Sequence, residues 1–249
     1  MALRRSGVQL PHSPQRLTNT FTLLKMNTAS ILQFLAQLEQ NNNKAWMDMH
    51  KAEYQVARET LLEITDHFIK ELSKIDADIA SLTPKDCIFR INRDIRFTKD
   101  KSPYKINMGA YLTKGGKNGG YAGYYLHLQP HDQSFIAGGL YQPMPDALKQ
   151  VRQEIDYNGD KLEAILSDKN FKEMFSSLQG ECLQRPPKGY HPDHTYIDWL
   201  KLKSFTVMHP ISDKKVIGPD FTKQVLEGFK LLTPLNQFFN AALAQADHA

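Results

Sequence analysis

The chain of 249 residues has no long apolar run and only two cysteines. No stretch approaches the roughly 20 consecutive apolar residues that span a bilayer, so we expect a soluble protein with no membrane partner. Cys87 and Cys182 lie far apart and outside any CxxC spacing, which argues against a disulfide framework and a thiolate zinc site. A reducing, cytoplasmic setting is therefore expected.

The sequence also lacks the short motifs that identify common catalytic and nucleotide-binding sites. It contains no P-loop, no GxSxG, no HExxH and no Rossmann fingerprint. Two histidine pairs have short spacing, but a proline separates His127 from His131, and His191 and His194 lie in a proline-rich loop. Neither pair has the further partners that a metal site needs. We expect no metal site, and the sequence leaves the cofactor and the reaction open.

Positive charge is unevenly distributed along the chain. The formal net charge is +4, but residues 1–25 contain four basic and no acidic side chains, so the remainder carries 27 of each sign. Within that neutral remainder, residues 85–117 hold nine basic side chains against three acidic ones. A local excess of this kind is typical of a site that binds an anion.

Residues 1–25 lack sustained periodicity and are rich in Ser, Thr and Arg. An acid-free leader of this composition resembles an organellar transit peptide, although it has no clear amphipathic stripe. We favour the alternative, a disordered N-terminal extension before a single domain over residues 26–249, with the ordered pattern beginning near Met26.

Periodicity predicts an α+β domain. Helical spacing of apolar residues indicates two helices near the N-terminus, the first capped by Ser30 and a longer one from about Lys51 to Ile75, and a last helical segment that begins at Pro219. Between the N-terminal and C-terminal helices, apolar and polar residues alternate in segments joined mostly by short links, which is typical of an antiparallel meander. We expect an antiparallel sheet of about five strands packed with helices. The expected strands cover residues 89–97, 106–113, 121–129, 134–141 and 202–208.

Three glycines, Gly123, Gly138 and Gly139, fall inside these expected strands. Glycine within a strand usually marks a bulge or a close approach of backbone or ligand. The alternative is a strand crossed tightly by an aromatic side chain such as Tyr124 or Tyr125.

The segment from Arg90 to Lys105 reads RINRDIRFTKDKSPYK and is unusually dense in charge. This string closely resembles the signature of a widespread family of conserved hypothetical proteins, catalogued as domain of unknown function 2461. The resemblance extends from about Ser30 to Leu243 and includes the Asn-rich corner before Trp46 and the stretch RPPKGY. It implies membership of a family that has no established activity.

The first functional hypothesis is a site for a phosphate- or carboxylate-bearing small molecule. Guanidinium groups bind such anions through two hydrogen bonds, and lysine adds a point charge. Asp94 and Asp100 would orient the arginines, or bind a metal that bridges to phosphate. In the alternative, these aspartates pair with the arginines and only stabilise the fold. The candidate ligand-binding residues are Arg90, Arg93, Arg96, Lys101 and Lys105, with Arg185 and Lys188 of the RPPKGY stretch expected at the same cleft.

No residue of the signature is identifiable as a nucleophile, so whether the protein is an enzyme stays open. If the site is catalytic, Tyr104 would donate a proton and Asp94 or Asp100 would act as a base. A tyrosine that follows a proline is also typical of a packed turn, in which its hydroxyl is already hydrogen-bonded.

The second hypothesis is a nucleic-acid-binding module, in which aromatic side chains of the sheet stack on bases and basic ones contact phosphates. The neutral charge of the body argues against it, because such proteins are generally basic over a broad face. A third possibility is a structural or partner-binding domain, and the sequence does not indicate an oligomeric state. The aromatic candidates are Phe97, Tyr104, Tyr111, Tyr121, Tyr124 and Tyr125.

Overall fold

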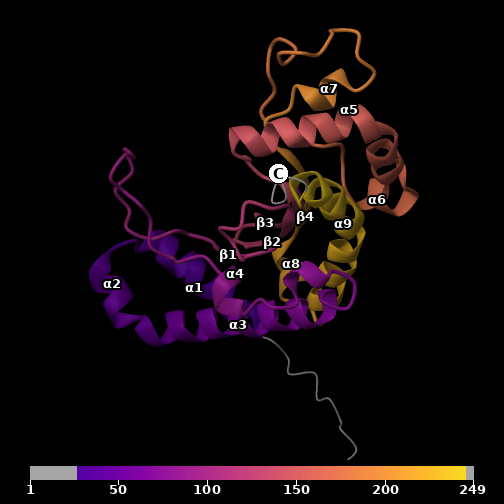
Figure 1. The fold of residues 1–249 in the computed structure, drawn as a ribbon. Coiled ribbons are helices and arrows are strands. Elements are labelled where there is room, and N and C mark those ends of the chain that lie inside the picture. The colour runs from indigo at the N-terminus through magenta and orange to yellow at the C-terminus, as the bar shows by residue number, and fades with distance from the viewer. Residues whose placement is uncertain (1–26, 245–249) are drawn as a thin grey trace, which may run out of the picture.

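The computed structural model describes residues 27–244, so the expectation for residues 1–25 lies outside it. The described chain has an α+β fold with one antiparallel sheet of four strands (Figure 1). No helix within it is both long and apolar enough to cross a bilayer. The helices are α1 (Thr28–Gln40), α2 (Lys44–Met49), α3 (Lys51–Leu72), the 3-10 helix η1 (Ala77–Ile79), α4 (Pro84–Cys87), α5 (Pro145–Ser167), α6 (Lys169–Met174), α7 (Ile197–Leu200), α8 (Asp213–Val216) and α9 (Phe221–Ala244). The strands are β1 (Met108–Leu112), β2 (Gly123–Leu128), β3 (Ser134–Leu140) and β4 (Phe205–Ile211).

The sheet is the expected antiparallel meander, with its strands in the order β1-β2-β3-β4. Residues directly opposite one another on neighbouring strands share a face of the sheet. Leu126, Ile136 and His209 are therefore on one face, and Tyr125 and Ala137 are on the other. We call the first the inner face, because α9 packs on it (Figure 1), and the second the outer face.

The core lies between the inner face, α9 and α3. The ring of Phe229 on α9 is 5.5 Å from that of Tyr124 on β2 and 5.3 Å from that of Phe68 on α3, measured between ring centres. All three side chains are fully buried, and burying a large apolar side chain stabilises a fold by about 1.5–3 kcal/mol. This packing covers much of the inner face and leaves the outer face available for other contacts.

The three strand glycines each allow a close approach. At Gly139, where φ is +105°, an added Cβ would lie 2.0 Å from the carbonyl oxygen of Phe205, and at Gly123 it would lie 2.4 Å from that of Leu112. At Gly138 an added Cβ would lie 2.6 Å from a methyl carbon of Leu232 on α9. Neighbouring backbone and an α9 side chain make these approaches, rather than a crossing tyrosine.

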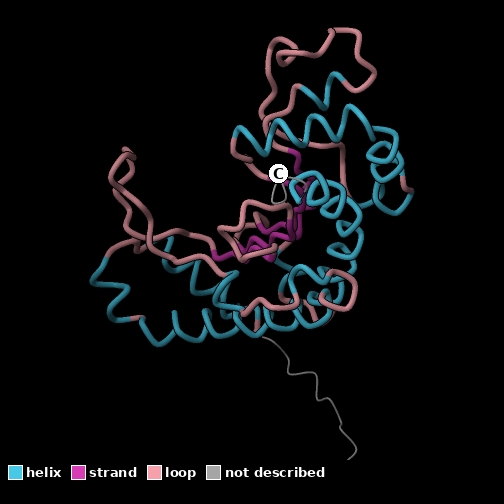
Figure 2. The backbone as a smooth tube through the Cα atoms, viewed as in Figure 1, coloured by secondary structure: helices cyan, strands magenta, loops and turns pink. Residues whose placement is uncertain are grey.

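Residues 88–107, which contain the signature, form a projecting loop that we call the arm (Figure 2). The prediction of a strand over residues 89–97 is wrong, since only isolated β-bridges occur in this part of the chain. The apolar residues that suggested one buried side do not share a side, because Ile91 is buried whereas Phe97 is 91% exposed. Aspartate side chains accept hydrogen bonds from backbone N–H groups two residues further on and turn the chain.

The first helix begins two residues before the expected cap. α1 starts at Thr28, and the Ser30 hydroxyl lies in its first turn, where it donates to the carbonyl oxygen of Asn27 (2.7 Å). The hydroxyl of Thr28 is buried and donates to the carbonyl oxygen of Val216 (2.6 Å). A tertiary contact that no local pattern reveals therefore sets this helix start.

Candidate functional site

The arm is anchored where it passes the corner between α1 and α2. The Asn42 amide donates to the carbonyl oxygen of Tyr104 (3.0 Å), and its oxygen accepts from the N–H of Tyr104 (3.1 Å). The side chains of Ile91 and Tyr104 are buried in the core. Tyr104, a candidate proton donor, thus holds the arm against the body of the protein.

The tip of the arm is held by internal ion pairs. Arg93 pairs with Asp100. Arg96 binds Asp94 through two hydrogen bonds, from Nε (2.9 Å) and from Nη2 (2.6 Å). The ammonium group of Lys101 donates to a backbone carbonyl within the arm (2.9 Å). These five predicted site residues are therefore already partnered with one another or with the arm.

The two aspartates of the tip are ionised well below neutral pH. Hydrogen bonds from the side chain and backbone of Arg96 lower the pKa of Asp94. Hydrogen bonds from the hydroxyl and backbone N–H of Ser102, together with Arg93, lower the pKa of Asp100. A general base that works at neutral pH has a pKa near 7, and the lowered pKa values of Asp94 and Asp100 make them weak bases. Their hydrogen bonds instead hold the arginines of the tip in place.

The two remaining cations, Arg90 and Lys105, lie near each other. The ammonium nitrogen of Lys105 is 5.6 Å from the centre of the Phe89 ring. Burial, and then the positive charge of Arg90, lower the pKa of Lys105. Neither side chain forms a hydrogen bond or an ion pair with any residue from 27 to 244, although Arg90 contributes weakly to lowering the pKa of Asp94. Neighbouring cations without a bound carboxylate are a candidate anion site.

Phe89 connects these cations to a row of rings on the outer face, which we call the aromatic face: Phe89, Tyr111, Tyr125, His127 and Phe135. Tyr125 contacts Phe89 and Tyr111 edge-on, at 6.2 Å and 6.4 Å between ring centres. His127 stacks on Phe135 at 4.5 Å. All five side chains are partly exposed, whereas their inward-facing neighbours on β2 and β3 are buried. The aromatic face therefore offers ring surface to a ligand beside the two cations.

Only part of the predicted base-stacking set contributes to this surface. Tyr124 is fully buried on the inner face, with its hydroxyl oxygen 2.8 Å from Asp76 and 3.1 Å from Thr233. Tyr104 is buried at the arm anchor, and Phe97 is at the exposed tip. Residues one apart in a strand point to opposite faces, which is why Tyr124 and Tyr125 have different environments.

A chain of hydrogen bonds fixes the polar groups of the aromatic face. The Tyr125 hydroxyl donates to Nδ1 of His127 (2.9 Å), and Nε2 of His127 donates to the side-chain oxygen of Gln129 (3.0 Å). Burial lowers the pKa of His127. Burial, helped by Tyr141, raises the pKa of Tyr125 to about 12. Both side chains are therefore uncharged at neutral pH, and Lys105 of the arm places a positive charge against the Phe89 end of this face.

Arg185 and Lys188 lie in the loop between α6 and α7, and both are exposed. One of the two histidines of this loop, His194, is bound to Asp156 of α5 (Nε2 to Oδ1, 2.9 Å). Figures 1 and 2 show this loop beyond α5 and well apart from the arm. The structure therefore does not bring Arg185 and Lys188 to the cations of the arm, and we leave these two residues out of the site proposed below.

The remaining histidine candidates have carboxylate partners of their own. His131 lies 2.9 Å from Glu39 on α1, and His191 lies 3.4 Å from Asp193. Across the described range, no group of three or more His, Cys, Asp or Glu side chains is placed to hold a metal ion.

A family model described as a conserved hypothetical protein, DUF2461, matches residues 30–238. The chain belongs to this family. The DUF2461 match covers every strand, the whole arm and most of the first and last long helices. Neither the comparison with curated proteins nor the one with solved structures found a match.

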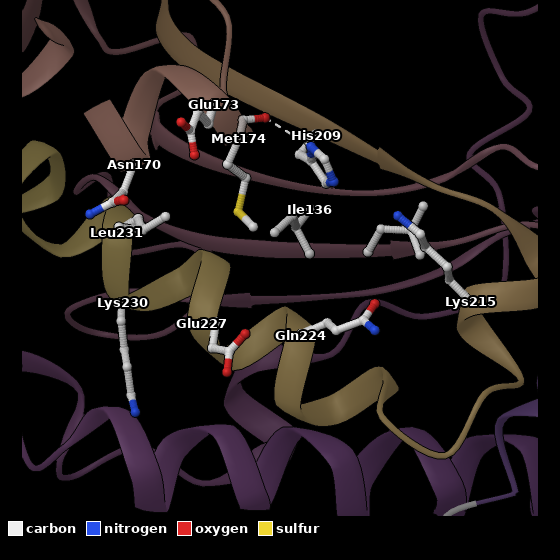
Figure 3. A pocket seen from close by; sticks show the side chains of 11 residues that line it. Ile136, Asn170, Glu173, Met174, His209, Lys215, Gln224, Glu227, Lys230 and Leu231 are labelled. Atoms are coloured by element: carbon white, nitrogen blue, oxygen red, sulfur yellow. Dashed lines mark hydrogen bonds between the residues drawn. The ribbon is translucent and has the colours of Figure 1, made fainter. Parts of the chain in front are cut away.

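The DUF2461 fold also contains a pocket that the sequence did not indicate. It has a volume of about 640 Å³ and lies between the inner face of β3 and β4 and the helices α6, α8 and α9 (Figure 3). Nothing in the sequence marks its residues, because they come from separate elements that meet only in the fold. They are Ile136, Asn170, Glu173, Met174, His209, Ile211, Lys215, Gln224, Glu227, Lys230 and Leu231.

Proposed function

We propose that this DUF2461 protein binds a small anion that carries a flat aromatic group. Arg90 and Lys105 would hold a phosphate or carboxylate, and the ring of the ligand would lie against Phe89 and Tyr125. The observation that carries the proposal is that the two cations lie together, beside the aromatic face, with no carboxylate bound to either in the described chain.

The charge arrangement favours an anion for a physical reason. A cation that is partly buried beside a second cation is destabilised in its charged form, which is why the pKa of Lys105 is lowered. A bound phosphate or carboxylate would remove this repulsion and accept a charge-assisted hydrogen bond from each side chain, each worth about 1.5–3 kcal/mol. The tip aspartates cannot take this role while they pair with Arg93 and Arg96.

The aromatic face selects the kind of anion. Phe89 is exposed and Tyr125 is partly exposed, so these edge-on rings offer a surface on which an aromatic ligand would gain about 0.5–1.5 kcal/mol beyond its buried area. The Tyr125 hydroxyl is engaged by His127 (2.9 Å), so this wall is fixed before the ligand arrives. A nucleoside monophosphate or an aryl phosphate has the required combination of ring and anion.

Calorimetric titration with adenosine monophosphate, adenosine and inorganic phosphate tests the proposal. We expect the monophosphate to bind best and Arg90→Gln or Lys105→Gln to weaken it about tenfold or more, the loss of one charge-assisted hydrogen bond. Lys99→Gln removes one exposed positive charge at the tip and should leave the affinity unchanged. Equal weakening in all three variants, or no binding to the wild type, would reject the site.

A second candidate is single-stranded nucleic acid on the same face. Sheets of four antiparallel strands with exposed rings bind unstacked bases in known RNA-binding modules, and this sheet has the partly exposed rings of Tyr111, Tyr125 and Phe135 on its outer face. An oligonucleotide that binds far more tightly than the mononucleotide, with an affinity that falls steeply with salt, would favour this reading. Absence of binding by either would leave a structural or partner-binding domain.

We also propose a reducing, cytoplasmic location. Both cysteines are free thiols, with Cys87 buried and Cys182 exposed. Burial raises the pKa of Cys87 to about 12, so this thiol is protected from oxidation. Fractionation that places the protein in an oxidising compartment would contradict the proposal.

A further inference from the structure

The pocket on the inner face has an apolar floor and polar walls. Ile136 of β3 and Met174 of α6 lie together on the floor, and Leu231 of α9 lies at one end beside Asn170 (Figure 3). Its volume of about 640 Å³ is within the range of small-molecule sites, roughly 300–1,000 Å³. The pocket and the aromatic face lie on opposite faces of the sheet, so the pocket is independent of the anion site proposed above.

His209 gives the pocket a defined hydrogen-bond acceptor. Its Nδ1 is 2.8 Å from the carbonyl oxygen of Met174, and because a carbonyl only accepts, Nδ1 carries the hydrogen. The Nε2 atom of the neutral ring is then an acceptor, and Figure 3 shows it on the side of the ring away from Met174. A ligand that donates a hydrogen bond is therefore favoured at this point.

Opposite charges line different walls of the pocket. Lys215 extends from α8 toward His209, whereas Glu227 projects from α9 (Figure 3). Neither forms an ion pair with another residue of the described range. The other two charged lining residues are directed elsewhere, because Glu173 pairs with Lys169 (3.9 Å) and Lys230 points toward α3. The pocket thus presents one cation and one anion at separate positions.

We propose that this pocket binds a short zwitterionic peptide with apolar side chains. The carboxylate of the peptide would pair with Lys215, its ammonium group with Glu227, and its amide N–H would donate to Nε2 of His209. The apolar side chains would pack on Ile136 and Met174. A single amino acid fills little of a pocket of about 640 Å³, whereas a dipeptide or tripeptide separates its two charges and brings the amide donor between them.

Nuclear magnetic resonance of the Met174 methyl group measures binding at the floor directly. The full chain, labelled at its eight methionines, is titrated with leucyl-leucine, with its N-acetyl form and with its C-terminal amide; Met174→Leu assigns the signal. We expect leucyl-leucine to shift the Met174 signal and each blocked peptide to bind about tenfold or more weakly, as one ion pair is lost in each case.

Charge variants then assign each end of the peptide. In Lys215→Gln, leucyl-leucine and its amide should bind equally, and in Glu227→Gln, leucyl-leucine and its N-acetyl form should bind equally. Lys214→Gln is the matched control, because Lys214 is an exposed neighbour on α8 outside the pocket, and it should retain the wild-type preference. The proposal is overturned if blocked and free peptides bind the wild type equally, or if leucyl-leucine leaves the Met174 signal unchanged at millimolar concentration.

Discussion

The side-chain amide of Asn42 is hydrogen-bonded to both backbone polar groups of Tyr104, which lies 62 positions later in the chain. This two-point contact joins the corner between α1 and α2 to the returning side of the arm. Arg90 and Lys105 belong to the same arm, so their position beside Phe89 depends on this contact. The Asn-rich corner and the charged signature, which look unrelated along the sequence, form one structural unit.

Replacing Asn42 by alanine should destabilise the protein by about 1–3 kcal/mol, since two backbone groups of a buried residue lose their partner. Denaturant unfolding measures the change. Asn41→Ala is the control, because the Asn41 side chain bonds only to the carbonyl oxygen of Gln37 within its own helix end. Equal losses in the two variants would show that the arm does not depend on Asn42.

The pKa of Asp100 reports whether the arm tip is preorganised. The hydroxyl of Ser102 makes the largest contribution to lowering this pKa, ahead of Arg93. Ser102→Ala and Arg93→Gln should therefore each raise the pKa of Asp100, as followed by carboxyl carbon resonances in an acid titration. An unchanged pKa in Ser102→Ala would mean that the hydroxyl of Ser102 does not hold the tip.

The sheet could be predicted because buried and partly exposed side chains alternate along much of its central strands. In β2 the inward residues Tyr124, Leu126 and Leu128 are buried, and the intervening Tyr125 and His127 are partly exposed. The hydrophobic pattern determines this register, since a shift by one residue would reverse the faces. In the arm, the same alternation predicted a strand over residues 89–97, which is wrong. Hydrogen bonds from backbone N–H groups to aspartate side chains turn the chain there and leave Phe97 in solvent.

Gly138 shows how α9 restricts the sheet. An added Cβ would lie 2.6 Å from one methyl carbon of Leu232, so Gly138→Ala should cost about 1–3 kcal/mol through overpacking. Leu232→Ala alone should cost about 2–5 kcal/mol because it leaves a cavity. In the double variant the new methyl occupies part of that cavity, so the combined loss should be smaller than the sum. Additive losses would show that the two residues do not meet.

His127 should make the free energy of unfolding decrease as the pH falls into the mildly acidic range. A histidine whose pKa is lower in the folded state than its unfolded value of about 6.5 contributes stability that is complete above that value and is lost as the pH falls toward the folded pKa. The free energy of unfolding of the wild type should thus fall more between pH 7.5 and 5.5 than that of His127→Gln. An equal or smaller fall in the wild type would mean that His127 is not buried in its neutral form.

The charged segment of the candidate site was visible in the sequence, but the partners of its side chains were not. The density of charge pointed to the arm, but the sequence could not show which cations are neutralised. Pairing depends on the turn that brings Asp100 back to Arg93. Among the predicted ligand-binding residues of the arm, Arg90 and Lys105 are left without a hydrogen-bond or ion-pair partner in the described chain. The inner pocket had no sequence signal, because His209, Lys215 and Glu227 meet only through the packing of α6, α8 and α9 on the sheet.

The pKa of Lys105, followed by resonances of its Nζ and Cε atoms, tests the central claim most directly. Burial and Arg90 lower this pKa in the free protein, and a bound anion favours the charged ammonium. We predict that the pKa of Lys105 rises in Arg90→Gln and also rises when the wild type is saturated with adenosine monophosphate. A pKa that stays unchanged on addition of the nucleotide would contradict an anion site at the base of the arm.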